Sequence, residues 1–148
     1  MALVIPAGAK LFPARWKKKR DGSFAHQPLI KWGAASSADE SQWREWLAMP
    51  DGYLCINLRE SGLVVVDLDL KHGQNGAERL AEWEAATGLT LPRLLVVRTP
   101  GGGLHVYFNG DCATKIGALP GVDCPAMVPV PGSVVPGKGE YVVSDFGL

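Results

Sequence analysis

Two aspartates at the end of an apolar run carry the sharpest chemical signal in the sequence. Asp67 and Asp69 follow the run Leu63-Val64-Val65-Val66, which predicts a central strand that is buried on both faces. Residues two apart in a strand point to the same face, so the two carboxylates are expected to converge. Neighbouring like charges cost free energy unless a cation lies between them, and Mg²⁺ or Mn²⁺ shared with substrate phosphates is the usual solution. A pair of aspartates that merely closes a strand and caps a turn is the alternative interpretation.

A histidine after a glycine-rich loop is the second candidate. His105 follows the segment Thr99-Pro100-Gly101-Gly102-Gly103-Leu104. Glycines allow a close approach of the backbone to a ligand and present N–H groups to anions, and a histidine beside them can donate to a phosphate. Taken alone, His105 is better explained as an ordinary strand histidine. Asp123 lies in a segment flanked by turn residues. It is a candidate site residue only because it follows the other motifs in order.

A basic segment near the N-terminus is the candidate for binding nucleic acid. It consists of Arg15, Trp16, Lys17, Lys18, Lys19 and Arg20. Asp21-Gly22 follows it, which predicts an exposed turn between two extended segments. Cations around a tryptophan can bind phosphates while the ring stacks on a base. A solvated hairpin tip explains the same residues equally well, because charge runs are usually just surface.

The elements that must position these residues are a mixture of strands and helices. Ser37 and Glu40 fit a capping box, which predicts a helix that begins at Ser37 and continues through Trp43, Trp46 and Leu47. Further predictions are a strand at 53–58, a helix at about 75–87 and a β-hairpin over 94–108. The last forty residues contain prolines at 125, 129, 131 and 136, which exclude a long helix and leave only short strands.

Composition limits the class of protein. The chain has 148 residues, a formal net charge of zero and 47% hydrophobic residues, so it is not disordered and can form one domain over residues 1–148. It contains no apolar run of the roughly 18–20 residues that span a bilayer. Its first ten residues do not resemble a signal peptide. We therefore expect a soluble cytoplasmic protein with no membrane partner. Three cysteines without a C-x-x-C pair predict neither a disulfide framework nor a zinc site.

Taken together and in order, these motifs resemble the N-terminal primase-polymerase (prim-pol) domain of the archaeo-eukaryotic primase superfamily, which is common in plasmid and phage replication proteins. Residues 62–69 resemble its first acidic motif, residues 99–108 its second motif, and Gly121-Val122-Asp123 its third. Pro131-Gly132-Ser133 with Gly139-Glu140-Tyr141 resembles the closing segment. The resemblance implies an α+β fold in a single compact domain. This fold has a mixed β-sheet, few flanking helices and a catalytic module like an RNA-recognition motif.

The resemblance also implies a function and a set of site residues. Asp67, Asp69 and Asp123 would hold two divalent ions, Mg²⁺ or Mn²⁺, for template-directed nucleotidyl transfer as a DNA primase, a DNA polymerase or both. The incoming NTP or dNTP would contact His105, Gly102, Gly103, Ser133 and Lys138. Single-stranded or primed DNA would lie along the basic segment. A replicative helicase, in trans or in a longer parent chain, is the further partner, because this chain has no phosphate-binding loop of the helicase type.

Several positions depart from the family pattern. The family often has a serine where Gly101 stands and a polar residue where Leu104 stands, so triphosphate affinity is expected to be reduced. The usual lysine before the family proline is Gln27, and Lys31 or the basic segment would take its place in binding nucleic acid. All three carboxylates are present, which favours an enzyme. A catalytically inactive module that binds nucleic acid stays open as the alternative, whereas a sugar transferase leaves the second and third motifs unexplained.

Overall fold

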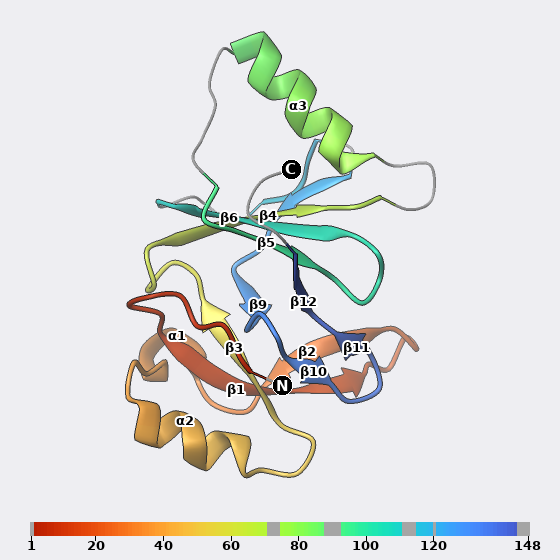
Figure 1. Ribbon diagram of the computed structural model, residues 1–148. Coiled ribbons are helices and arrows are strands. Elements are labelled where there is room, and N and C mark those ends of the chain that lie inside the picture. Colours follow the sequence, from red (N-terminus) through yellow and green to blue (C-terminus); the bar gives the residue numbers. More distant parts are fainter. Residues whose placement is uncertain (1, 71–74, 88–92, 111–114, 120, 145–148) are drawn as a thin grey trace.

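Two antiparallel sheets face each other across the main hydrophobic core (Figure 1). The computed structural model describes residues 2–70, 75–87, 93–110, 115–119 and 121–144. The four-stranded sheet has the order β2 (Phe24–Pro28), β1 (Leu11–Lys18), β3 (Tyr53–Asn57) and β9 (Met127–Pro129). The six-stranded sheet has the order β12 (Val142–Ser144), β5 (Leu95–Arg98), β6 (Leu104–Asn109), β4 (Leu63–Leu68), β8 (Val122–Cys124) and β7 (Lys115–Leu119). A separate two-stranded ribbon pairs β10 (Val134–Val135) with β11 (Gly139–Glu140).

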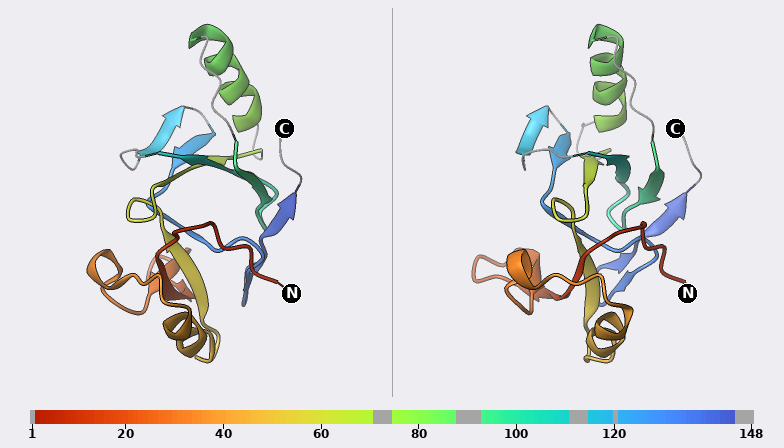
Figure 2. Two further views of the ribbon diagram at one scale, coloured as in Figure 1. Left: turned by 60° about the vertical axis from the view of Figure 1, so that its left-hand side comes forward. Right: turned by 90° about the vertical axis from the view of Figure 1, so that its left-hand side faces the viewer.

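The strand β4 separates two hydrophobic clusters because its side chains alternate between two faces. Leu63 and Val65 belong to the large cluster that joins both sheets, whereas Val64, Val66 and Leu68 pack in a smaller cluster on the other face. Helix α3 (Gly76–Thr87) packs Ala77 and Leu80 of its N-terminal half against that smaller cluster on the outer face of the six-stranded sheet, and the rest of the helix rises away from the sheet (Figure 2). The face that carries Leu63 and Val65 therefore points toward the four-stranded sheet.

The α+β class expected from the sequence is confirmed, but the sheets are not mixed. Every pairing between described strands is antiparallel. Tight connections such as those of the β1–β2 and β5–β6 hairpins allow only antiparallel neighbours. The segment β4–α3–β5–β6 places β6 between β4 and β5, which is a split βαβ unit. The module like an RNA-recognition motif that the resemblance implies stays a prediction.

The first long helix begins later than the capping box predicts. Helix α2 spans Glu40–Leu47, and its N-cap is Asp39, whose side chain accepts a hydrogen bond from the Ser41 N–H at 2.9 Å. Ser37 cannot be the cap because its backbone forms a bridge with Leu11 of β1. Pairing with the sheet thus holds Ser37 extended, and a helix starts only after it.

Other elements agree with the sequence, or were missed by it. The hairpin predicted over 94–108 forms as β5 and β6, and the helix predicted at about 75–87 forms as α3. The short helix α1 (Trp32–Ala35) and the strands β7 and β11 were not expected. In the part of the chain that the structure describes, no helix is both long enough and apolar enough to cross a membrane.

Candidate active site

Asp67 lies in β4 between a histidine and a second aspartate on the neighbouring strands. It is the register partner of His105 in β6 on one side and of Asp123 in β8 on the other. Directly opposite residues of antiparallel strands project from the same face, so these three side chains form one row. The Nε2 atom of His105 is 3.6 Å from Oδ2 of Asp67. We call Asp67, His105 and Asp123 the Asp67 row. The fold brings these residues together although they are separated by up to 56 positions in the sequence.

The Asp67 row continues the core-facing side of β4. Leu63 and Val65 precede Asp67 at the strand period of two, and both are buried in the core between the sheets. The Asp67 side chain is 39% exposed, so this position lies where the core gives way to solvent. A carboxylate here keeps partial access to water and to ligands while its strand is fixed on both sides by pairing.

Asp69 is the first residue after β4 and is held by backbone contacts. Its N–H donates to the Gly121 carbonyl at 2.7 Å, and its carbonyl accepts from the Gly76 N–H at 2.8 Å. A Cβ atom on Gly76 would lie 2.9 Å from the Leu68 Cα, so the start of α3 approaches β4 as closely as only glycine allows. Both predicted members of the Asp-x-Asp motif are thus placed at the end of one rigid strand.

The residues predicted to bind metal ions are present, and the strand register brings two of them together, but their side chains are not arranged around a common point. Within the described ranges, no group of three or more His, Cys, Asp or Glu side chains is arranged to hold a metal ion. Asp67 and Asp123 nonetheless share one face, and carboxylate oxygens are the donors that Mg²⁺ and Mn²⁺ take. The donor set therefore fits a divalent ion in chemistry, and the assignment of Asp67, Asp69 and Asp123 as ligands stays a prediction.

The glycine loop lies against the end of β4, but its amides are used internally. The N–H of Gly102 donates to the Thr99 carbonyl at 2.9 Å, and that of Gly103 donates to Thr99 Oγ1 at 3.1 Å. These two donors are therefore not directed at an anion, contrary to the expectation from the sequence. A Cβ atom on Gly103 would lie 2.6 Å from the Leu68 carbonyl oxygen, so glycine is needed here for close packing against β4.

Lys138 reaches the space between the two sheets from the turn of the β10–β11 ribbon. Its ammonium donates to the Tyr141 hydroxyl at 2.7 Å, lies 3.4 Å from His26 Nε2 and sits 4.4 Å above the centre of the Trp16 ring. Burial lowers the pKa of Lys138, and the negative charge of Asp67 opposes that shift. The predicted phosphate-binding lysine is thus electrostatically linked to the Asp67 row.

His26 connects this lysine to the four-stranded sheet. Its Nδ1 atom contacts the Tyr53 hydroxyl, and its ring packs at 4.9 Å from that of Trp16. Burial lowers the pKa of His26 to about 4, and the charges of Lys138 and His105 add to the effect. His26 is therefore neutral at pH 7 and does not repel the lysine. We call His26, Tyr53, Lys138 and Tyr141 the Lys138 cluster.

The Lys138 cluster also contacts the Asp67 row. The ring of Tyr141 lies 5.7 Å from that of His105, and Tyr141 donates its backbone N–H to the Ser133 carbonyl. His105 is 5% exposed, and its Nδ1 atom is buried without a hydrogen-bond partner, so only its Nε2 side meets Asp67. Ser133 is 3% exposed, and its backbone supports the segment that carries Tyr141.

The basic segment forms the β1–β2 hairpin predicted from the sequence, but its side chains divide between two faces. Trp16 pairs with His26 and Lys18 pairs with Phe24, so these residues share the face that meets Lys138. Arg15 and Lys17 project from the opposite face, where Arg15 Nε donates to the Pro50 carbonyl at 3.2 Å. Lys31 lies exposed before α1, at the other end of the four-stranded sheet from the β10–β11 ribbon (Figure 1).

Sequence reasoning missed His26, Tyr53 and Tyr141 as parts of the site. They come from three separate strands or turns, and the contact between His26 and Lys138 joins residues 112 positions apart. No spacing rule connects such residues before the fold is known. A histidine next to a basic, aromatic hairpin was the one available signal, and it pointed to no partner.

Comparison with known protein families agrees with the resemblance. The family model Prim-Pol, described as "Bifunctional DNA primase/polymerase, N-terminal", matches residues 2–145. Neither the curated proteins nor the solved structures give a match.

Proposed function

The chain belongs to the Prim-Pol family, and from this we propose that it adds nucleotides to a DNA strand under the direction of a template. The observation that carries the proposal is the register of the Asp67 row. It sets the carboxylates of the first and third motifs and the histidine of the second motif side by side on adjacent strands.

The acidic residues would serve as metal ligands. Asp67, Asp69 and Asp123 would hold two ions, Mg²⁺ or Mn²⁺, which supply charge neutralisation at the triphosphate and lower the pKa of the attacking 3′-hydroxyl. The strand register holds Asp67 beside Asp123. The backbone hydrogen bond between the Asp69 carbonyl and the Gly76 N–H holds Asp69 next to the start of α3. Rigid strands hold such ligands more precisely than loops do.

A histidine and a lysine would bind and orient the triphosphate. His105 Nε2, which faces Asp67, would donate to a phosphate oxygen, and the Lys138 ammonium would contribute a positive charge. The neutral state of His26 leaves Lys138 as the positive group of its cluster. Gly103 would act by allowing the loop to approach β4, and Gly102 by adopting the φ of 89° that the turn has there, rather than by donating hydrogen bonds.

An inactive module with the same fold is the second candidate, and specific observations favour it. Among the described residues the carboxylates do not form a closed ligand set, and the amides of the glycine loop are already bonded to Thr99. Such a module would bind DNA through the basic segment without adding nucleotides. The replicative helicase expected from the resemblance stays a prediction under either candidate.

Incubation with template DNA separates the two candidates. The protein is mixed with primed and unprimed single-stranded DNA, labelled ribo- or deoxynucleotides, and Mg²⁺, Mn²⁺ or EDTA. The proposal expects products that depend on the metal ion. Binding of the template with no product under either metal would contradict the proposal and support the inactive module.

A further inference from the structure

Two aromatic rings are stacked at the open edge of the four-stranded sheet. The rings of Trp16 and Phe24 lie 5.6 Å apart at an angle of 12°. Phe24 is the first residue of β2, which is the edge strand, and it is 51% exposed. Because Trp16 covers one face of the Phe24 ring, this exposure leaves an apolar surface of the ring open to solvent.

A positively charged hollow surrounds this edge. It has a volume of about 690 Å³ and is lined by Lys17, Lys18, Lys19, Arg20, Ala25, His26, Gln27 and Pro28. All four cations are exposed, and no carboxylate is among the lining residues. The nearby Asp21 at the turn uses Oδ1 to accept hydrogen bonds from the backbone and the hydroxyl of Ser23. The hollow is thus suited to a chain of phosphates.

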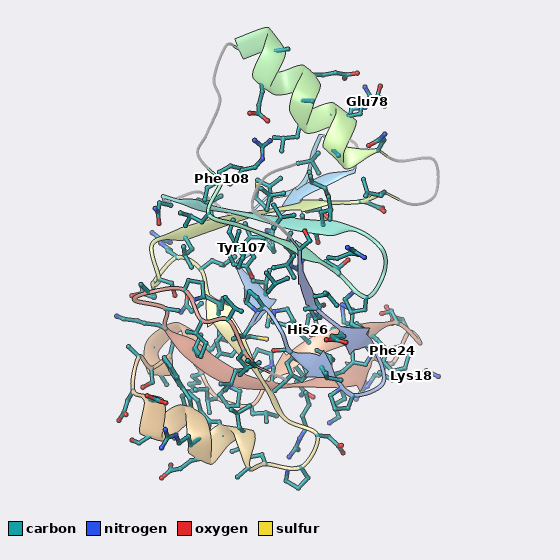
Figure 3. The ribbon with its side chains drawn as sticks, in the orientation of Figure 1. Lys18, Phe24, His26, Glu78, Tyr107 and Phe108 are labelled. Carbon is teal, nitrogen blue, oxygen red and sulfur yellow. The ribbon has the colours of Figure 1, made fainter. Side chains whose placement is uncertain are left out.

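The stacked rings and the cations lie side by side. Lys18 is the register partner of Phe24, and Figure 3 shows His26, Phe24 and Lys18 in succession toward the turn of the hairpin. Phe24 is not among the residues that line the hollow, but Lys18 lines it and lies on the Phe24 side of the hairpin, so a polyanion bound at Lys18 passes the Phe24 ring. A base can stack on that ring only when it is not already stacked inside a duplex, so the arrangement favours a single strand.

We propose that the β1–β2 edge binds single-stranded DNA, with one unpaired base stacked on Phe24 and the adjoining phosphates along Lys18, Lys19 and Arg20. The DNA would be the template, so this inference rests on the proposed function. Trp16 links the two sites, because it supports Phe24 on one side and lies under Lys138 on the other. The bound strand would thereby lie on the face that leads to the Asp67 row.

The affinity for a labelled single-stranded oligonucleotide, measured by fluorescence anisotropy, tests this proposal. Measurements are made in EDTA without nucleotides, so they do not depend on whether the protein is an enzyme. We expect Phe24→Ala to weaken binding by about 5- to 150-fold and Phe24→Trp to retain it, since stacking on one base contributes about that much. Leu47→Ala is the matched control, because Leu47 is 44% exposed on α2, and it should bind like the wild type.

The salt dependence separates stacking from charge. Phe24→Ala should leave the slope of log affinity against log salt unchanged, whereas Lys18→Ala should reduce it by about 0.7. Phe24→Ala should also leave the weaker binding of duplex DNA unchanged. Wild-type affinity of a folded Phe24→Ala protein for the single strand, or an equal loss for duplex and single strand, would overturn the proposal. If the protein adds no nucleotides but the variants lose affinity for the single strand as predicted, the proposed function alone would be contradicted.

Discussion

At the scale of single residues, the site depends on a lysine that is kept charged next to a histidine that is kept neutral. The Tyr141 hydroxyl, the Trp16 ring and the Asp67 charge stabilise the charged form of Lys138, whereas burial destabilises that form. His26 sits beside it without a charge because burial favours the neutral imidazole. Burial lowers the pKa of both groups, and one experiment on each residue tests its assigned role.

His26 is expected to make the protein less stable as the pH falls. Its pKa is about 4 in the folded protein and 6.5 in the unfolded chain, so between these values the unfolded chain binds more protons. The free energy of unfolding should thus be unaffected by His26 above about pH 6.5 and fall progressively toward pH 4. Thermal unfolding across this range should show a steeper dependence in the wild type than in His26→Gln. Equal slopes in the two proteins would contradict the neutral, buried state of His26.

Lys138 is expected to act on nucleotide binding. Lys138→Met removes a charged donor, and bonds between charged groups contribute about 1.5–3 kcal/mol, so KM for the nucleotide should rise about 10- to 100-fold. Steady-state extension at varied nucleotide concentration measures this change. Lys10→Met serves as the control, because the Lys10 side chain is 44% exposed and its ammonium lies 3.9 Å from Glu60 in a surface ion pair. An unchanged KM in Lys138→Met would remove Lys138 from the triphosphate site.

At the scale of elements, the sequence predicted those parts that local pattern determines. The run at residues 63–66, the glycine hairpin and the basic turn all formed where patterns of apolar, glycine and polar residues placed them. The start of α2 moved from Ser37 to Asp39 because pairing with Leu11 held Ser37 in an extended conformation. Strand β11 has two residues and exists only through its pairing with β10, so no local pattern could have predicted it. Strand β7 has the sequence KIGAL, and its central glycine weakens the pattern of a strand.

The contact between the glycine loop and β4 gives a prediction at this scale. A Cβ atom on Gly103 meets the Leu68 carbonyl, whereas a Cβ atom on Gly101 in the same loop meets nothing within 4 Å. Gly103→Ala should therefore lower the free energy of unfolding by about 1–3 kcal/mol and reduce nucleotide addition by displacing the end of β4. Gly101→Ala should leave stability nearly unchanged. Urea unfolding of the two variants makes the comparison, and equal midpoints would contradict the close approach.

At the scale of the whole molecule, the two sheets carry different parts of the proposed activity. The six-stranded sheet presents the Asp67 row, and the four-stranded sheet presents the basic hairpin. The Lys138 cluster lies between them, since it contacts His105 through Tyr141 and Trp16 through Lys138. The motifs in the sequence predicted the residues of the Asp67 row and those of the basic hairpin separately. The sequence could not predict the link, because the joining residues are more than a hundred positions apart and share no periodicity.

The rate of primer extension by Asp67→Asn shows whether the Asp67 row is the catalytic centre. Asp67→Asn keeps the size and shape of the side chain but removes the charge that the proposed metal ions require and replaces one acceptor oxygen with an NH2 donor. Asp51→Asn is the matched control, because Asp51 is exposed with a φ of 57°, a conformation that asparagine also adopts. We expect Asp67→Asn to fold like the wild type and to lose about 100-fold or more in rate with either Mg²⁺ or Mn²⁺, while Asp51→Asn stays active. A folded Asp67→Asn protein that extends primers at the wild-type rate would contradict the assignment of the Asp67 row as the catalytic centre.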